Sequence, residues 1–189
     1  MNTPATTTLL SVRQLTMRFG GLTAIDDLSL EVPAGKITGI IGPNGAGKTT
    51  LFNCLTGFYK PTTGSLRLAH PRHGEIRLET LPSHRVARDA QVVRTFQNIR
   101  LFPKMTVLEN LIVAQHNVLQ RASKFSIAGL FNLPGYRRAE AESIARAATW
   151  LRRLGLEHLA DHAAGELPYG IQRRIEIARA LCVDPLLLC

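Results

Sequence analysis

Residues 42–50 read Gly42-Pro43-Asn44-Gly45-Ala46-Gly47-Lys48-Thr49-Thr50, and through Thr49 they match the pattern G-x-x-x-x-G-K-S/T. The glycines let the backbone curl until several N–H groups point at phosphate oxygens. The lysine brings a mobile positive charge to the phosphates, and the threonine hydroxyl can ligate Mg²⁺. A chance match in a chain of this kind is expected roughly once in 150 sequences. The stretch predicts a phosphate site, and the plain structural alternative is a Gly-rich turn with an exposed lysine.

The flanks of the motif have the pattern that a phosphate-binding loop requires. Residues 36–41 form a short β-branched run bounded by glycines, which predicts a buried strand. Residues 48–55 place apolar side chains on one side and stop at Gly57, which predicts a helix. The loop is therefore expected to lead into a helix N-terminus, whose unpaired donors and dipole favour anions.

Short strands are predicted elsewhere in the first half of the chain, and helices in the second half. Residues 10–17 and 28–32 alternate apolar and polar side chains, and residues 64–78 contain short runs separated by turn signals. Thr106 and Glu109 have the spacing of a capping box, which predicts the start of a helix. The apolar face of that helix is Leu108, Leu111, Ile112 and Leu119.

Residues 121–136 contain glycine and proline and predict a loop or a broken helix. Residues 137–154 predict an amphipathic helix. Its core stripe is Ile144, Ala147, Ala148, Leu151 and Leu154. A last helix is expected after Gly170, and residues 186–189 begin a buried strand.

Composition is typical of a soluble globular chain of about one domain, with 189 residues of which 45% are hydrophobic. No run approaches the ~18–20 apolar residues of a membrane helix, and the start of the chain lacks the features of a secretory signal. Three cysteines without paired spacing favour a reducing compartment. The net charge of +9 is dispersed along the chain, which favours a generally basic surface over a nucleic-acid groove.

The remaining motifs resemble those of ATP-binding subunits of ABC transporters, over nearly the whole chain. Phe19, within Met17-Arg18-Phe19-Gly20-Gly21, occupies the place of the adenine-stacking aromatic. Val93-Arg94-Thr95-Phe96-Gln97 is similar to the Q-loop, whose glutamine would contact Mg²⁺ or the attacking water. The resemblance also identifies a signature segment at the start of the last helix, composed of Leu167, Pro168, Tyr169, Gly170, Ile171 and Gln172.

Finer detail resembles one branch of this family. Residues 52–62, 94–97 and 147–151 are similar to the LivG-type subunit of high-affinity branched-chain amino-acid importers. The resemblance implies an α/β fold in which residues 1–97 form a P-loop core with an antiparallel β subdomain, residues 98–175 a helical subdomain, and residues 176–189 the return to the core.

The same resemblance implies ligands and partners. ATP would bind at residues 42–50 and Phe19, with Mg²⁺ at Thr49 and Gln97. The partners would be transmembrane permease subunits and a second ATP-binding subunit in a head-to-tail dimer, at the cytoplasmic face of the inner membrane. No nucleic-acid partner is expected.

Three departures from the family pattern qualify the expected activity. Pro168 stands where a small polar residue is usual, and it has neither a hydroxyl nor an N–H to donate. Ile171 replaces a polar residue and falls on the apolar stripe of its helix. The chain ends at Cys189, before the Walker B Asp, the catalytic Glu and the switch His of the family, so a C-terminally incomplete cassette is expected.

Three functions follow as hypotheses. The first is a transport ATPase that drives amino-acid import, and the second is a nucleotide-binding module that binds ATP without turnover. The third is a soluble ABC protein acting on ribosomes or DNA, for which tandem domains or a basic linker would be expected. The transported amino acid is not decided by this sequence, because specificity in such importers resides in other subunits.

Overall fold

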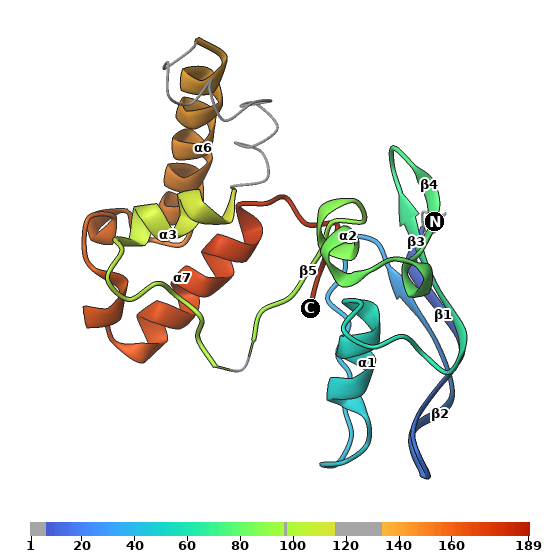
Figure 1. Ribbon diagram of the computed structural model, residues 1–189. Coiled ribbons are helices and arrows are strands. Elements are labelled where there is room, and N and C mark those ends of the chain that lie inside the picture. Colours follow the sequence, from blue (N-terminus) through green and yellow to red (C-terminus); the bar gives the residue numbers. More distant parts are fainter. Residues whose placement is uncertain (1–6, 97, 116–133) are drawn as a thin grey trace, which may run out of the picture. The chain divides into compact units, whose positions relative to one another are not determined.

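The computed structural model describes residues 7–96, 98–115 and 134–189. These residues form two compact units, one of residues 7–93 with Cys189 and one of the described residues between 94 and 188. We call them unit 1 and unit 2 (Figure 1). The predicted division at residues 97 and 175 stays a prediction.

Unit 1 is built on an antiparallel sheet in the order β2-β1-β3-β4. Its strands are β1 (Thr8–Phe19), β2 (Leu22–Pro33), β3 (Thr63–His70) and β4 (Gly74–Arg77). The alternation of apolar residues buries one face of β1 and β3, through Leu10, Val12, Leu66 and Leu68. The strands predicted from alternation and turn signals are thereby confirmed.

Helix α1 (Lys48–Leu55) has the predicted bounds and lies against one side of the sheet (Figure 1). It buries Leu51, Cys54 and Leu55, so its apolar stripe is what attaches it to unit 1. The other helices and strands described in this unit are η1 (Leu78–Thr80), α2 (Ser83–Arg88) and β5 (Val92–Val93).

The prediction of a buried strand at residues 36–41 is wrong for this structure. These residues have no strand conformation, and the side chains of Ile37 and Ile41 are 103% and 97% exposed. β-Branched residues favour a strand when a neighbouring strand supplies hydrogen bonds and a packing surface. Within the described residues no strand pairs with residues 36–41. The intrinsic β preference of these residues alone is therefore not sufficient to form a strand.

Unit 2 is helical. It contains α3 (Val107–Ala114), α6 (Pro134–Arg153) and α7 (Tyr169–Leu181), with η2 (Glu157–Leu159), η3 (Ala164–Glu166) and the short strand β6 (Leu187–Leu188). The three α-helices pack against one another (Figure 1). Their shared core consists of Val107, Leu111, Ala147, Leu151, Leu156, Ile175, Ala178 and Cys182.

The capping box of α3 is confirmed. The Thr106 side chain accepts a hydrogen bond from the Glu109 N–H at 3.1 Å, and the Glu109 carboxylate accepts one from the Thr106 N–H at 2.8 Å. These two bonds satisfy donors that the first turn of a helix otherwise leaves open. Leu119 and most of residues 121–136 lie outside the described residues.

Helix α6 begins slightly earlier than predicted, at Pro134. Proline is well tolerated in a first helical turn because it has no N–H to leave unpaired there. Ala147 and Leu151 are buried as predicted, whereas Ile144, placed in the same stripe, is 40% exposed. The apolar stripe of α6 is therefore buried at Ala147 and Leu151, toward the C-terminal end of the helix, and exposed at Ile144.

No helix in the described part of the chain is both long and apolar enough to cross a membrane. Cys54 and Cys182 are buried, free thiols, and burial raises their pKa to about 11 and about 12. They remain protonated near neutral pH and act as small apolar core residues.

Candidate nucleotide site

The glycines of the phosphate loop are required for two different reasons. Gly45 and Gly47 have φ values of +85° and +80°, a region that residues with a Cβ rarely adopt. A Cβ at Gly45 would meet open space among the described residues, whereas one at Gly47 would lie 2.3 Å from the Ala24 carbonyl oxygen. Gly47 therefore lets the loop lie directly against the backbone of β2.

The loop opens onto the N-terminus of α1, as the motif predicts. The first intrahelical hydrogen bond runs from the Leu51 N–H to the Gly47 carbonyl at 2.9 Å, so the N–H groups of residues 48–50 precede it. Gly47 is the N-cap residue, and no side chain of the described residues caps this end. Open donors and the helix dipole together favour an anion at this position.

Lys48 folds back over the loop that precedes it. Its ammonium donates hydrogen bonds to the carbonyl oxygens of Gly42 and Pro43, at 2.7 and 2.6 Å. An ammonium has three donors, so these bonds hold the charge at the loop while leaving capacity for a further acceptor. The positive charge is thus held beside the open N–H groups, where a phosphate would be bound.

The residues present fit a nucleotide with Mg²⁺. The Thr49 hydroxyl is on the first turn of α1, and this residue is exposed. Hydroxyl oxygen is a suitable ligand for Mg²⁺, which is usually held by few protein oxygens together with phosphate and water. No cluster of three or more metal-binding side chains occurs in the described parts of the chain.

A hollow of about 260 Å³ lies beside the loop, lined by residues of β2 and α1 and by residues 40–41. Ile25, Leu28 and Leu51 give it an apolar wall, with Lys48 and Asp26 also at its lining. Apolar walls do not suit a triphosphate, so we assign the phosphates to the open helix N-terminus and not to this hollow.

Phe19 lies at the end of β1, where it pairs with Leu22 across the hairpin turn. Its side chain is 41% exposed, and its ring contacts the Tyr59 ring at a centroid distance of 5.1 Å. Along β2, Leu22 is separated by about 7 Å of extended backbone from Ala24, the residue that touches Gly47. The aromatic residue and the phosphate loop therefore lie toward the same end of the β1–β2 hairpin.

The signature segment forms the start of α7 in unit 2. Pro168 is the N-cap residue, and its carbonyl accepts hydrogen bonds from the N–H groups of Ile171 and Gln172 at 2.9 and 3.0 Å. The Gln172 side chain donates to the Leu167 carbonyl at 2.7 Å. Tyr169 is 67% exposed, while Ile171 packs against the core of unit 2, as its place on the apolar stripe predicts.

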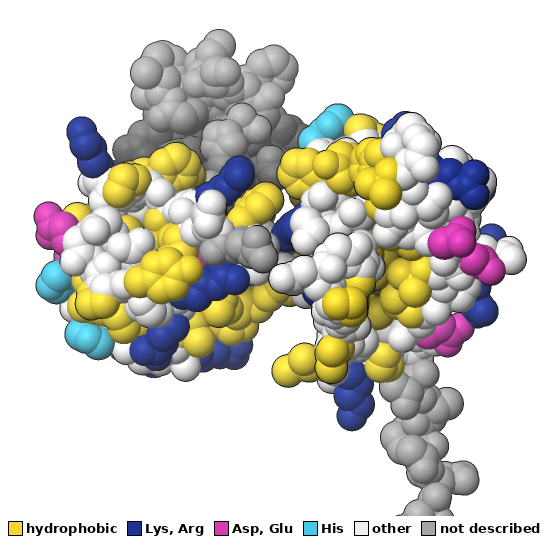
Figure 2. Space-filling view, turned by 90° about the horizontal axis from the view of Figure 1, so that it is seen from below, with side chains coloured by type: hydrophobic (Ala, Val, Ile, Leu, Met, Phe, Trp, Pro, Cys, Tyr) yellow, Lys and Arg dark blue, Asp and Glu magenta, His cyan; other side chains and the backbone are white. Residues whose placement is uncertain are grey.

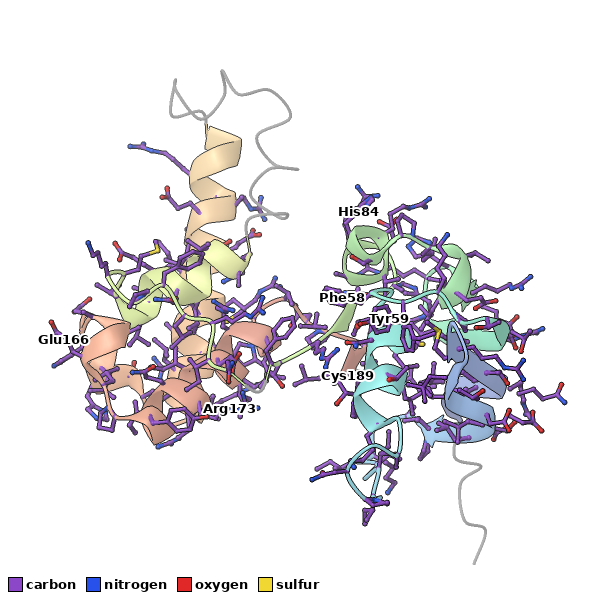
Figure 3. The ribbon with its side chains drawn as sticks, turned by 60° about the horizontal axis from the view of Figure 1, so that its bottom comes forward. Phe58, Tyr59, His84, Glu166, Arg173 and Cys189 are labelled. Atoms are coloured by element: carbon purple, nitrogen blue, oxygen red, sulfur yellow. The ribbon has the colours of Figure 1, made fainter. Side chains whose placement is uncertain are left out.

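A charge network around the buried Glu176 of α7 was not predicted from the sequence. Glu176 is 2% exposed, and its carboxylate pairs with Arg173 at 2.5 Å. Arg173, which is labelled in Figure 3, also donates to the Phe96 carbonyl. Arg179 donates to the Arg100 carbonyl at 2.5 Å, and burial lowers the pKa of its guanidinium. The network holds backbone on either side of position 97 in sequence, but Gln97 itself lies outside the described residues. Arg-x-x-Glu-x-x-Arg spacing on one helix face is the signal that could have indicated it.

Basic side chains are scattered over the face shown in Figure 2 and do not gather into one patch. This agrees with the dispersed charge that the sequence predicts, with a net charge of +9.

Residues 25–189 match the family model described as ABC transporter. The chain belongs to the ABC transporter family. It is 54% identical over 180 residues to the high-affinity branched-chain amino acid transport ATP-binding protein LivG of Salmonella typhimurium, covering 95% of this chain and 67% of that protein. Identity to the branched-chain amino acid transport ATP-binding protein BraF of Pseudomonas aeruginosa is 52% over the same shares.

Solved ABC cassettes share the fold. The crystal structure of the ADP conformation of MJ1267, an ATP-binding cassette of an ABC transporter, matches with a TM-score of 0.77 at 33% identity, over 97% of this chain and 68% of that one. The α/β cassette fold and the resemblance to the LivG type are thereby confirmed. The ABC assignment also supports ATP as the nucleotide of this family.

Proposed function

We propose that this chain is the ATP-binding subunit of an ABC importer for branched-chain amino acids, and that ATP binds at residues 42–50. The observation that carries the proposal is the phosphate loop, in which Gly47 lies against β2 and Lys48 holds its charge at the open start of α1. The 54% identity to LivG supports the transported class.

Each group has a distinct task in this proposal. The N–H groups of residues 48–50 bind phosphate oxygens, Lys48 neutralises their charge, and Thr49 contributes its hydroxyl to Mg²⁺. When bound, Mg·ATP supplies the γ-phosphoryl group, and the transfer of this group to water drives transport. Phe19 stacks on the adenine, and Gln97 acts at the metal and the attacking water.

The partners are transmembrane permease subunits and a second ATP-binding subunit in head-to-tail arrangement, at the cytoplasmic face of the inner membrane. Solved relatives include dimeric cassettes, at 25% identity and a TM-score of 0.69. In such a dimer, the exposed start of α7 would offer its open N–H groups to the nucleotide on the partner. In this arrangement the signature segment contacts the nucleotide bound to the partner subunit, while the phosphate loop binds the nucleotide of its own subunit.

Titration calorimetry with Mg·ATP tests the nucleotide site. Lys48→Ala should weaken binding by about 1.5–3 kcal/mol, the range for a charge-assisted hydrogen bond to phosphate. Lys36→Ala is the matched control, since it removes an equal charge from an exposed position outside the motif. Equal affinities for Lys48→Ala and the parent chain would contradict the assignment.

A second candidate is a module that binds ATP without turnover. Pro168 favours it, because the signature of this chain has no hydroxyl or N–H at that position to offer a partner's nucleotide. Phosphate release measured beside ATP binding separates the two candidates: a module binds ATP but releases no phosphate.

A further inference from the structure

Phe19 and Tyr59 form an exposed aromatic pair in unit 1. Their ring planes meet at 76°, and the two side chains are 41% and 39% exposed. Edge-to-face pairs of this kind are favoured by the charge distribution of the rings. Phe19 is the residue proposed to stack on the adenine, whereas Tyr59 has no role in the proposed function.

Tyr59 is placed by the end of the phosphate-loop helix. The N–H groups of Phe58 and Tyr59 both donate to the Asn53 carbonyl in α1, at 2.9 and 3.2 Å. The turn between them and α1 passes through Gly57, at φ +73°, where a Cβ would approach the Ser83 Cα and the Val86 side chain to 3.0 Å. The backbone of Tyr59 (Figure 3) is thus held by α1 on one side and by the packed turn on the other.

The same segment is tied to the end of β1. The Thr62 N–H donates to the Thr16 carbonyl at 2.9 Å, and the Thr62 hydroxyl accepts from the Arg18 N–H at 3.0 Å. Arg18 directly precedes Phe19. The backbone of residues 57–62 therefore links α1 to β1, and the ring contact of Tyr59 with Phe19 completes this link at the side-chain level.

We propose that Tyr59 is a positioning residue for base recognition, holding the Phe19 ring in the orientation that stacks on adenine. The inference rests on the proposed nucleotide site. A base stacked parallel to Phe19 would be steeply inclined to the Tyr59 ring, so Tyr59 does not share the stacking and acts through Phe19. Because Tyr59 is anchored on the phosphate-loop helix, it fixes the aromatic platform relative to the phosphates.

Titration calorimetry with two probes tests this role, namely Mg·ATP and magnesium tripolyphosphate, which has the phosphates without the base. Tyr59→Ala should weaken Mg·ATP binding about three- to tenfold, the range expected for loss of one aromatic pair. Tripolyphosphate affinity should be unchanged. Tyr59→Phe retains the ring and should retain the ATP affinity of the parent.

Two further variants serve as controls. Phe58→Ala removes the neighbouring aromatic, 59% exposed, and should leave the affinity for both probes unchanged. Tyr59→Leu keeps apolar volume without a ring, so it should behave like Tyr59→Ala even where the alanine variant folds poorly.

The outcomes separate this inference from the proposed function. A parent chain that binds neither probe would refute the nucleotide site itself. A parent chain that binds both, with Tyr59→Leu unchanged toward ATP or weakened equally toward both probes, would overturn the positioning role alone.

Discussion

Replacing Gly47 by alanine tests how the phosphate loop is built. A Cβ there would lie 2.3 Å from the Ala24 carbonyl oxygen and 3.1 Å from the Ile25 side chain. The first distance is about 1 Å shorter than van der Waals contact, and the obstacle is backbone, so the loop and β2 have to separate. Left-handed backbone adds about 1–2 kcal/mol for a non-glycine residue, and overpacking typically adds about 1–3 kcal/mol.

Gly45→Ala is the matched control for this variant. Its φ of +85° is nearly the same as that of Gly47, but a Cβ at Gly45 would meet open space. Both variants therefore carry the backbone strain, and the difference between them isolates the close approach to β2. Gly47→Ala should be less stable than Gly45→Ala by about 1–3 kcal/mol, which corresponds to a melting temperature roughly 2–12 °C lower.

Thermal unfolding followed by circular dichroism, together with calorimetric titration of Mg·ATP, measures both consequences. A shift of the loop misdirects the N–H groups at the start of α1, so Gly47→Ala should bind Mg·ATP at least about tenfold more weakly than Gly45→Ala. Equal melting temperatures and equal affinities for the two variants would refute the conclusion that contact with β2 sets the loop's conformation.

Three further predictions concern partners, turnover and pH. Single cysteines at positions 98–104 should crosslink to co-expressed permease subunits, and crosslinks obtained only from the exposed face of α6 would indicate a different docking surface. Phosphate release should separate the two candidate functions: turnover near 1 s⁻¹ that disappears in Lys48→Ala supports the transport ATPase, and ATP binding without release supports the module, the result that Pro168 in the signature favours. Hydrogen bonds from Arg88 and Arg85 hold the pKa of the Asp89 carboxyl well below its usual range. The ionised carboxylate therefore stabilises the fold at pH values above its unfolded pKa of about 3.9, and this contribution is lost as the pH falls. The melting-temperature difference between the parent and Asp89→Asn should therefore shrink between pH 7 and pH 3, and a constant difference would show that the ion pairs contribute nothing.

Local signals in the sequence predicted much of unit 1 and the candidate site. The phosphate-loop pattern, the bounds of α1 and the capping box at Thr106 each depend on residues within one or two turns of one another. Such features are decided by backbone freedom, capping and amphipathic spacing, all of which can be read from short segments. The same reasoning predicted that Ile171 packs, because its position on the helix stripe is a local property.

Features that depend on distant residues were decided by the tertiary structure. Residues 36–41 have the composition of a strand, yet a strand requires a neighbour, and none pairs with them in the described chain. The approach of Gly47 to Ala24, the contact of Tyr59 with Phe19 and the bond from Arg173 to the Phe96 carbonyl all join segments separated in sequence. Sequence alone determined the chemistry of the phosphate loop, because that chemistry is contained in one short segment. The surroundings that hold the loop, the aromatic ring and the signature helix in place were decided by the fold. Packing brings together residues that are far apart in the sequence, and local sequence patterns do not predict such contacts.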